Sequence, residues 1–516
     1  MEQERLLKNR RPTTRSPHTR WAELCRRFLP VTVAGSVWRY SRGMSPDDPE
    51  QGWKLHISAT VLTAGRVLRR VGPLLRDRGV LFKATASLGE LMKLNSGFDY
   101  GYSQVGKFIT VYPRTSGEAV QLAERLHELT RGMRAPAVPF DHQYRPGGCV
   151  YYRYGAFRSI EVKGRDGETA HFIRDPEGNL VPDVRDAVSR PTWFADPFLD
   201  ESARPAQAPA EPTPLRTTFK AFRALAQRGR GGVYQALDLG ATPPRLCVLK
   251  EGRRAGETSW DGRDGAWRVR HEGRVLAALR EAGVGVPRLY SSFRAEGNHY
   301  IAVEFIEGES LDGRLARRRR RLPVAAALRF GAELARLVAS IHAAGWVWRD
   351  CKPGNVVVTK SGGLRPLDFE GACPVSRPDP QPWGTPAFLA PECGAVFRGQ
   401  SRQPEDLYAL GATVYLLLAG RLPDESAPAP LARMRRDVPE RAQRAVARLL
   451  DPDPRRRPDA ASAARGLEAA LKSLTSARAQ GARLSRRVRS ANRGSSRMTS
   501  KAGSTARCMR LGVRSA

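Results

Sequence analysis

The residues of this chain best suited to chemistry lie in WVWRDCKPGNVVVT and in the LRPLDFEGA that follows it. Phosphoryl transfer needs a group that orients the acceptor hydroxyl, a cation on the transferring phosphate and oxygen ligands for magnesium. Asp350 fits the catalytic base that orients the hydroxyl, and Lys352 fits the cation that steadies the phosphate. Asn355 and Asp368 offer the amide and carboxylate oxygens that we expect to hold Mg²⁺. The spacing predicts a phosphotransfer site.

A glycine-rich turn and a lysine precede this group in the order that phosphoryl transfer requires. The segment RGRGGVY places Gly229, Gly231 and Gly232 between two strand-like stretches, where glycine lets backbone N–H groups approach phosphates closely. Lys250 ends a later apolar strand, and Glu272 lies on a predicted helix from which it can pair with Lys250. We expect these five residues to bind the nucleotide, ATP or GTP.

Further charged residues complete the order found in protein kinases. Glu392 ends WGTPAFLAPE, Asp406 begins a largely apolar helix, and Arg457 in DPDPRRRP fits the ion-pair partner of Glu392. So many charged positions in one fixed order are hard to explain as incidental carboxylates of a helical domain. Residues 215–472 are therefore predicted to form a bilobal protein-kinase-like domain.

Two residues depart from the usual kinase pattern. Trp348 stands where most kinases carry a histidine, and Glu370 replaces the glycine that usually follows Asp368–Phe369. The histidine has an architectural role, so an aromatic replacement is tolerable. The metal-binding carboxylate of Asp368 is retained, so we expect a competent site.

A second polar group lies among apolar strands nearer the N-terminus. Lys54 and His56 are two residues apart in QGWKLHISAT, so both face the same side of a strand. Lys83 ends the apolar strand GVLFKAT, and two more cations follow on later segments, Lys107 and Arg153. Each of these residues alone is more simply a solvated or structural side chain. Together, four cations and an imidazole among apolar strands predict an anion pocket.

The elements that carry this second group predict an α+β domain. Strand-like pieces (KLHISAT, GVLFKAT, KFITVYP, CVYYRYGAF) alternate with two amphipathic helices. One helix is expected over Ala64–Arg76, with Pro73 kinking or shortening it. The other is expected over Ser116–Thr130, with a serine as its N-cap.

The order of KLHISAT, FKAT, SQVGKFITVYP and YYRYG resembles the lyase domain of class III and class IV lanthipeptide synthetases, which is similar to bacterial phosphothreonine lyases. RGGVY, VLKEGR and the DFE at Asp368 resemble the kinases of class III synthetases. The resemblance implies that Lys83 removes the α-proton of a phosphorylated residue and that His56 protonates the departing phosphate. It also implies three phosphate contacts, from Lys54, Lys107 and Arg153. A lysine can act as such a base when burial and neighbouring cations lower its pKa.

The resemblance implies a bifunctional peptide dehydratase. The kinase would phosphorylate Ser or Thr of a precursor peptide that carries a leader segment. The lyase would then eliminate phosphate to give dehydroalanine or dehydrobutyrine. Two alternatives remain: a regulatory Ser/Thr kinase with an N-terminal phosphopeptide-binding domain, and an inactive, truncated remnant that only binds.

Composition divides the chain into five segments: an N-terminal extension 1–50, a lyase-like domain 51–200, a Pro/Ala-rich linker 201–214, the kinase-like domain 215–472 and a basic, disordered tail 473–516. The few aromatic residues of the extension are expected to pack on the domain that follows. The family's cyclase domain is expected to be absent, because 44 residues with one cysteine and no histidine follow Lys472.

Composition also limits location and partners. No signal peptide or run of eighteen apolar residues is present, which predicts a cytoplasmic protein without a transmembrane segment. The seven cysteines are scattered without a C-x-x-C pair, so no structural zinc is expected. The net charge of +34 permits nucleic acid as a partner. No groove lined with aromatic residues is indicated beside the charge, and we therefore expect no nucleic-acid partner.

Overall fold

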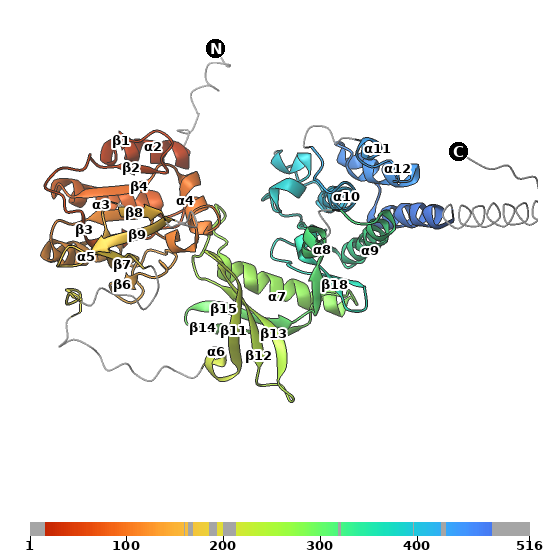
Figure 1. Ribbon diagram of the computed structural model, residues 1–516, viewed down its shortest axis with the longest axis horizontal. Helices are drawn as coiled ribbons and strands as arrows, with labels where there is room; N and C mark the ends of the chain where they lie inside the picture. Colours follow the sequence, from red (N-terminus) through yellow and green to blue (C-terminus); the bar gives the residue numbers. More distant parts are fainter. Residues whose placement is uncertain are drawn as a thin grey trace, which may run out of the picture. The chain divides into compact units, whose positions relative to one another are not determined.

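The computed structural model describes residues 16–158, 160–163, 169–184, 193–199, 213–317, 321–395, 397–424 and 430–476. The chain forms two compact units (Figure 1), the first of Met1–Ala277 with Arg288–Phe305 and the second of Ala278–Pro287 with Ile306–Ala516. Most of the predicted linker and nearly all of the predicted tail lie outside the described residues.

The first unit begins with a seven-stranded sheet in the order β1-β2-β4-β5-β3-β7-β6. Its strands are β1 (Val31–Thr32), β2 (Trp38–Tyr40), β3 (Gln51–Ile57), β4 (Leu81–Thr85), β5 (Ile109–Tyr112), β6 (His142–Gln143) and β7 (Val150–Ala156). The helices of this domain are α2 (Pro17–Phe28), α3 (Ala64–Asp77), α4 (Leu88–Ser96) and α5 (Ser116–Thr130), with a short 3₁₀ turn η1 (Tyr102–Gln104). All described strand pairs in this sheet are antiparallel.

Strand alternation gives this sheet one apolar and one polar face. On β3, Trp53, Leu55 and Ile57 join the hydrophobic core with α2, α3 and α5. Lys54 and His56 alternate with them and therefore face the other side of the sheet. The predicted anion pocket thus lies on the face of the sheet opposite α2, α3 and α5.

Residues 16–50 are part of this domain. The side chains of Trp21, Cys25 and Phe28 on α2 are buried in its core, and β2 pairs with β4 so that Tyr40 is the partner of Lys83. The domain boundary expected at residue 51 therefore lies inside a continuous fold, because the aromatic residues before it complete the sheet and its core.

Both predicted helices are present, with two local differences. Helix α3 continues through Pro73 to Asp77, so the proline does not end it. Helix α5 spans Ser116–Thr130 as expected, but its N-cap is Thr115, whose hydroxyl accepts a hydrogen bond from the Glu118 N–H at 3.1 Å. The serine therefore occupies the first helical position.

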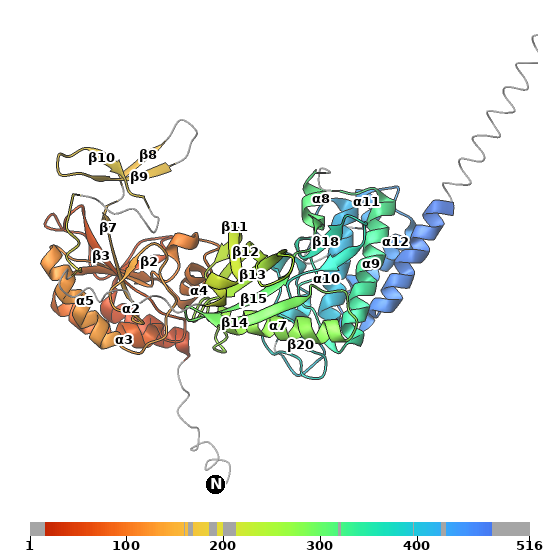
Figure 2. The ribbon, with the colours of Figure 1, turned by 90° about the horizontal axis from the view of Figure 1, so that it is seen from below.

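A small antiparallel sheet lies on the side of the main sheet away from α2 and α3 (Figure 2), and its strands are β8 (Ile160–Lys163), β9 (Thr169–Arg174) and β10 (Leu180–Pro182). The first unit then continues into a five-stranded antiparallel sheet in the order β11-β12-β13-β15-β14. Its elements are α6 (Pro214–Thr217), β11 (Phe219–Arg228), β12 (Gly231–Asp238), β13 (Arg245–Gly252), β14 (Leu289–Ala295), β15 (Asn298–Glu304) and the helix α7 (Gly265–Glu281).

The second unit is mainly helical around α10 (Gln403–Ala419), which is buried along most of its length and packs against α9 (Val324–Ala343) and α12 (Glu440–Leu449). Its remaining helices are α8 (Leu311–Arg317), α11 (Leu431–Met434) and a helix over residues 460–476. Two small sheets combine β16 (Gly308–Ser310), β18 (Val356–Thr359) and β19 (Leu364–Pro366), and β17 (Trp346–Val347) with β20 (Cys373–Pro374). Among the described residues, we find no helix that combines the length and apolar character needed to span a bilayer.

Candidate active sites

The residues predicted to form the anion pocket come together on the polar face of the seven-stranded sheet. Strand register places Lys83, Thr110 and His56 side by side on β4, β5 and β3. Lys54 and Arg153 are direct partners on β3 and β7, two residues along from that row. Because residues two apart on a strand share a face, both rows project into the same space.

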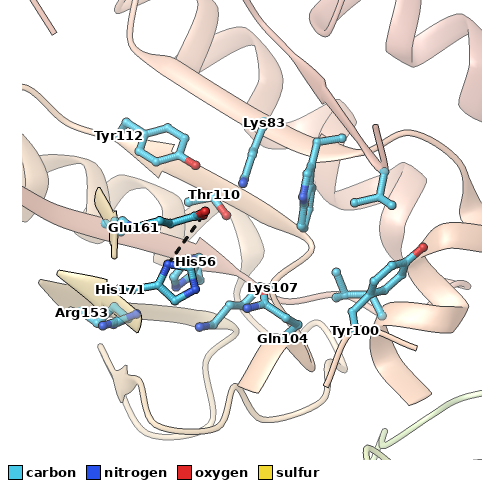
Figure 3. Close-up of a pocket in the computed structure, with 14 residues that line it drawn as sticks. His56, Lys83, Tyr100, Gln104, Lys107, Thr110, Tyr112, Arg153, Glu161 and His171 are labelled. Atoms are coloured by element: carbon cyan, nitrogen blue, oxygen red, sulfur yellow. Dashed lines mark ion pairs between the residues drawn. The ribbon is translucent and has the colours of Figure 1, made fainter. Parts of the chain in front are cut away.

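This space is a pocket of about 490 Å³, into which the labelled side chains converge in Figure 3. Lys107, from the loop after η1, completes the predicted set. The small sheet adds a wall, since Glu161 on β8 and His171 on β9 also line the pocket, with Nδ1 of His171 3.9 Å from Oε1 of Glu161. The structure therefore brings all five predicted pocket residues together.

Burial and like charge weaken ionisation of two pocket residues. Burial, followed by the nearby Arg153 guanidinium, lowers the pKa of Lys54 to about 7. Burial also lowers the pKa of His56 to about 4, although Asp141 acts in the opposite direction. The pocket thus reduces its own positive charge before an anion enters.

Two carboxylates that sequence reasoning missed hold the pocket cations in place. Asp141 is fully buried, accepts a short hydrogen bond from Nδ1 of His56 and lies 3.4 Å from Nζ of Lys107. Burial opposes its ionisation, but His56 and Lys107 outweigh that effect and lower the pKa of Asp141 to about 2. Asp183 pairs in the same way with Arg153.

Because the Asp141 carboxylate occupies Nδ1 of His56, the other ring nitrogen, Nε2, is left for the pocket. No local signal marked either carboxylate. Asp141 lies in a loop before the two-residue strand β6, and Asp183 follows the three-residue strand β10.

Lys83 contacts an aromatic residue from the predicted N-terminal extension. Its Nζ lies 4.4 Å from the centre of the Trp38 ring, and Trp38 also lines the pocket. This cation–π contact holds the lysine amine at the edge of the pocket.

The five-stranded sheet and α7 carry the predicted nucleotide-binding residues. Nζ of Lys250 on β13 lies 2.7 and 2.8 Å from the two carboxylate oxygens of Glu272, which is buried on α7. The predicted pair is therefore formed. The glycine-rich turn joins β11 to β12, and Arg228 pairs with Gly231 across it.

The second unit positions the predicted catalytic loop. Nζ of Lys352 lies 2.7 Å from Oδ2 of Asp350 and 2.6 Å from the hydroxyl oxygen of Thr385. The Thr385 hydroxyl donates to Oδ1 of Asp350 at 2.9 Å. The amide nitrogen of Asn355 donates to the Asp350 side chain at 2.7 Å and to its carbonyl oxygen at 3.0 Å. Sequence reasoning had not included Thr385.

The predicted magnesium ligands fit a hard cation. The amide nitrogen of Asn355 is engaged by Asp350, so the amide oxygen is the atom left to face a metal. The backbone carbonyl of Asn355 accepts from the N–H of Leu367 at 2.7 Å, which places Asp368 next to it in the chain. Asp368 has a positive φ of 63°, a conformation that is unusual for aspartate and concentrated at functional sites. Amide and carboxylate oxygens suit Mg²⁺.

A buried carboxylate holds the backbone just before the catalytic loop. Asp406 on α10 is fully buried and accepts from the backbone N–H of Trp348 at 2.8 Å and of Arg349 at 2.6 Å. Nε2 of His342 lies 2.9 Å from the same carboxylate. Nε1 of Trp348 donates to the carbonyl of Asp368 at 2.9 Å, so the indole that replaces histidine braces a predicted metal ligand.

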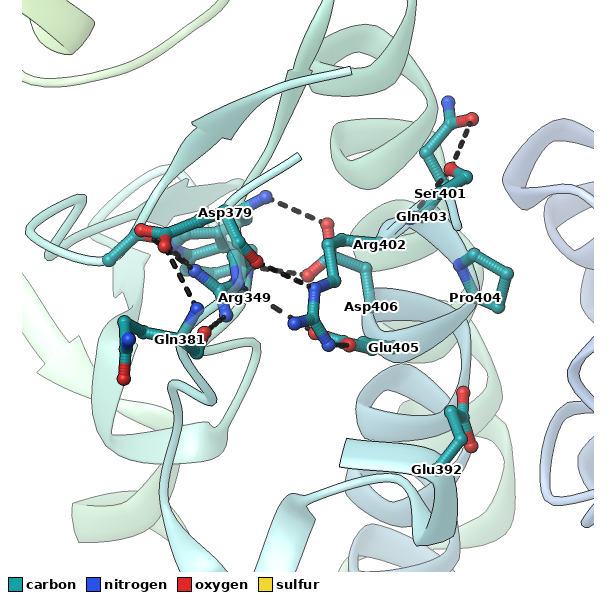
Figure 4. Close-up of polar contacts among 12 residues, drawn as sticks. Arg349, Asp379, Gln381, Glu392, Ser401, Arg402, Gln403, Pro404, Glu405 and Asp406 are labelled. Atoms are coloured by element: carbon teal, nitrogen blue, oxygen red, sulfur yellow. Dashed lines mark hydrogen bonds and ion pairs between the residues drawn. The ribbon is translucent and has the colours of Figure 1, made fainter. Parts of the chain in front are cut away.

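The segment after Asp368 is held by buried arginines (Figure 4). Arg349 lies 3.6 Å from Asp379 and 3.7 Å from Glu405, and Arg402 also pairs with Glu405. The predicted partners Arg457 and Glu392 form two hydrogen bonds, at 2.6 and 2.9 Å.

The six described cysteines are free thiols. All six are buried, and burial raises the pKa of each, for example to about 11 in Cys25 and Cys247.

Two protein families match consecutive parts of the chain. Residues 31–210 match the family described as RamC, N-terminal domain, and residues 229–466 match the protein kinase domain. Both matches confirm the resemblance drawn from the sequence motifs and the predicted fold class.

Three proteins are similar to parts of this chain. A protein named probable SapB synthase, from Streptomyces coelicolor, is 34% identical over 69% of this chain and 39% of its own length. The serine/threonine-protein kinase PknA of Mycobacterium tuberculosis is 32% identical over 40% of this chain and 48% of its own. CBL-interacting protein kinase 4 of Oryza sativa subsp. japonica is 36% identical over 35% of this chain and 43% of its own. The chain thus spans less than half the length of these relatives.

Proposed function

We propose that this chain, which joins a RamC-type N-terminal domain to a protein kinase domain, is a bifunctional peptide dehydratase. The kinase domain phosphorylates Ser or Thr of a precursor peptide, and the N-terminal domain eliminates the phosphate. The observation that carries the proposal is the row of Lys83, Thr110 and His56 in a cation-lined pocket. A pocket that only bound phosphate would not need an amine and an imidazole on either side of one site.

In the phosphotransfer step, Asp350 orients the acceptor hydroxyl and takes up its proton. Lys352, already held against Asp350 and Thr385, neutralises charge on the transferring phosphoryl group. Asn355 and Asp368 would hold Mg²⁺, which supplies charge neutralisation on the nucleotide phosphates when bound. ATP and GTP both supply the phosphoryl group that this chemistry needs.

In the elimination step, the Lys83 amine takes the proton from Cα of the phosphorylated residue. The electron pair of that C–H bond becomes the Cα–Cβ double bond, and the Cβ–O bond to phosphate breaks. His56 gives a proton to the departing oxygen, so hydrogen phosphate leaves. The products are dehydroalanine from phosphoserine and dehydrobutyrine from phosphothreonine.

The pocket charges support both roles of this step. An incoming phosphate adds negative charge beside His56, which raises the pKa of its imidazole from the low value of the empty pocket and lets it act as an acid. Lys54, Lys107 and Arg153 stabilise the charge that develops on the leaving phosphate. Asp141 keeps the imidazole in the orientation that presents Nε2.

Mass spectrometry tests the proposal. The chain is incubated with ATP or GTP, Mg²⁺ and a candidate precursor peptide that includes its leader. Phosphorylation adds about 80 Da and completed elimination leaves a net loss of about 18 Da for each residue. A product that carries phosphate but never loses it would contradict the dehydratase and favour a kinase with a phosphopeptide-binding domain.

A further inference from the structure

One stretch of the N-terminal domain, residues 94–104, lies between the anion pocket and the glycine-rich turn. It runs from the end of α4 through η1. Leu94, Tyr100 and Gln104 line the anion pocket. The residues between them contact the glycine-rich turn of the five-stranded sheet, which belongs to the same compact unit.

The closest of these contacts is made through the backbone. The N–H of Gly229 donates to the carbonyl of Ser96 at 2.8 Å. A Cβ atom on Gly229 would lie 1.7 Å from the carbonyl oxygen of Asn95, so residue 229 must be glycine for the turn to sit against α4. This hydrogen bond engages the Gly229 N–H, so Gly229, which the sequence predicted to bind the nucleotide, serves here to seat the turn against the end of α4.

On the N-terminal side of this contact, the side chain of Asn95 is fixed by two hydrogen bonds. Asn95 is buried, and its side chain donates to the carbonyl of Ala59 at 2.9 Å and accepts from the N–H of Gly106 at 3.1 Å. Gly106 immediately precedes Lys107 of the pocket. The residue that faces the glycine-rich turn therefore also fixes the loop that carries a pocket lysine.

Aromatic rings strengthen the contact on either side. The guanidinium of Arg253 lies 4.9 Å from the centre of the Tyr102 ring, and its Nη1 donates to the carbonyl of Arg228 at 3.1 Å. Arg228 in turn lies 5.1 Å from the centre of the Phe98 ring. Tyr102 therefore supports, through Arg253, the residue that opens the glycine-rich turn.

A second element of the five-stranded sheet also rests on the N-terminal domain. Trp260, in the loop between β13 and α7, packs against the core of that domain, and its ring lies 5.4 Å from that of His18. The helix that follows this loop carries Glu272, the partner of Lys250. Both supports thus lead to predicted nucleotide-binding residues.

We propose that the N-terminal domain is a structural part of the kinase's nucleotide site, with residues 94–104 acting as a support for the glycine-rich turn. The inference rests on the kinase half of the proposed function and is independent of the elimination step. Tyr102 is a positioning residue, because it acts on the turn through Arg253. Without this support, the turn has to be ordered by the nucleotide itself, which weakens binding.

The test uses the full chain and a fluorescent ATP analogue with Mg²⁺. We expect Tyr102→Ala to weaken binding by about fivefold, the scale of a partly buried cation–π contact, and Tyr102→Phe to restore it because the ring is kept. Hydrogen exchange of the peptide that spans residues 226–234 is expected to speed up in Tyr102→Ala, since the Gly229 N–H loses protection. Arg253→Gln removes the same contact from the other side, which keeps the test valid if Tyr102→Ala fails to fold.

The matched control is Arg245→Ala. Arg245 lies 3.6 Å from the centre of the Tyr290 ring, a cation–π contact within the five-stranded sheet itself. Nucleotide binding by this control is expected to stay within about twofold of wild type, because Arg245 and its ion-pair partner Asp238 lie at the end of β12 and β13 away from the glycine-rich turn. If Tyr102→Ala and Arg253→Gln bind the analogue and exchange hydrogen as the control does, the inference is wrong.

The binding and exchange measurements need neither phosphotransfer nor elimination. If the wild-type chain never dehydrates a peptide but the variants still bind the nucleotide analogue weakly, the dehydratase proposal fails. The proposal that residues 94–104 support the glycine-rich turn then still stands. If the wild-type chain dehydrates the peptide and the variants bind the analogue as wild type does, the support proposal fails and the dehydratase proposal stands.

Discussion

In the proposed function the anion pocket and the catalytic loop both act on a phosphoryl group, but the two sites are built differently. In the pocket, Lys83, Thr110 and His56 project from three neighbouring strands, and strand register sets their spacing. In the loop, residues 350–355 are adjacent in sequence and are held by a few remote groups, among them Asp406, which binds the backbone just before the loop, and Thr385, which binds Asp350. The comparison teaches that a sheet distributes the support of a site over many backbone hydrogen bonds, whereas a loop concentrates it in a few anchors.

The sharpest way to separate the two regions is to remove one acid–base residue from each. We expect Lys83→Ala to slow elimination from a synthetic phosphopeptide by about 10²–10⁴-fold, the usual contribution of a general base, while phosphorylation continues and phosphopeptide accumulates. Asp350→Ala is expected to abolish phosphorylation and leave that elimination intact. Mass spectrometry of the peptide products distinguishes the two.

Lys93→Ala is the matched control for the lysine change, because Lys93 is an exposed residue of α4 whose amine lies 3.0 Å from Glu90. Its elimination rate is expected to equal that of wild type. Continued dehydration by Lys83→Ala would show that Lys83 is not the base.

The anchor of the loop offers the next largest effect. Asp406→Asn replaces an acceptor of backbone N–H groups by an amide, so we expect a loss of about 3 kcal/mol or more in stability and a phosphotransfer rate at least about tenfold lower. Calorimetry of the full chain and a kinase assay measure both quantities. Elimination from a synthetic phosphopeptide is expected to survive.

Glu468→Gln serves as the control for this anchor, since Glu468 is a more exposed carboxylate of the same unit, 3.5 Å from Arg336. If Asp406→Asn is as stable and as active as this control, the loop has other anchors and the contrast with the sheet fails.

A smaller effect is expected at the carboxylate behind His56. Asp141→Asn removes a negative charge that raises the pKa of His56, so the protonated imidazole is lost at lower pH. We expect elimination at neutral pH to fall by about 10–100-fold, less than the loss of a proton-transfer group itself. The limb of the pH–rate profile that reports the acid is expected to move to lower pH.

The profile of kcat/KM for a synthetic phosphopeptide is the measurement, and Asp77→Asn at an exposed position is the control. A lower rate with an unmoved profile would mean that Asp141 only supports folding.

The smallest effect concerns the stability that the fold loses by burying the Lys54 amine in the pocket. Burial lowers the pKa of Lys54 to about 7 from its ordinary 10.5, so the unfolded chain binds more protons than the folded one in that interval. Stability is therefore expected to rise with pH from about 7 towards 10.5. Lys54→Met is expected to stabilise the chain by about 1 kcal/mol near pH 6.5, with a gain that shrinks at higher pH.

Thermal unfolding of wild type and Lys54→Met at several pH values tests this. Inorganic phosphate is expected to stabilise the wild type more than the variant, because Lys54 repels its neighbours less when an anion is bound. A variant that is less stable than wild type at every pH would show that the pocket carries no such cost.

The sequence predicted which kinase residues lie together, because most of them are close in the chain. Asp350, Lys352 and Asn355 share one short loop, and apolar strands on either side mark where it begins and ends. The pairing of Lys250 with Glu272 was also predictable, because a strand followed by an amphipathic helix leaves few other partners for a buried lysine.

The pocket was predictable only in part. Strand alternation placed Lys54 and His56 on one face. The sequence of a single strand does not determine which strands will be its neighbours in the sheet. Asp141 and Asp183 were missed for the same reason, since each lies in a loop and becomes a partner of a cation only after the sheet has assembled. The role of Trp38 was missed because its segment looked like an extension of the domain.

The burial of the six described cysteines acquires a meaning from the proposed product. Dehydroalanine and dehydrobutyrine are electrophiles that thiolates attack, and this protein would generate them at its own surface repeatedly. Thiols that are out of reach of the peptide and whose pKa is raised by burial stay protonated and do not add to such a double bond. If the proposed function holds, the packing of cysteine in the described domains would protect the enzyme from alkylation by its own product.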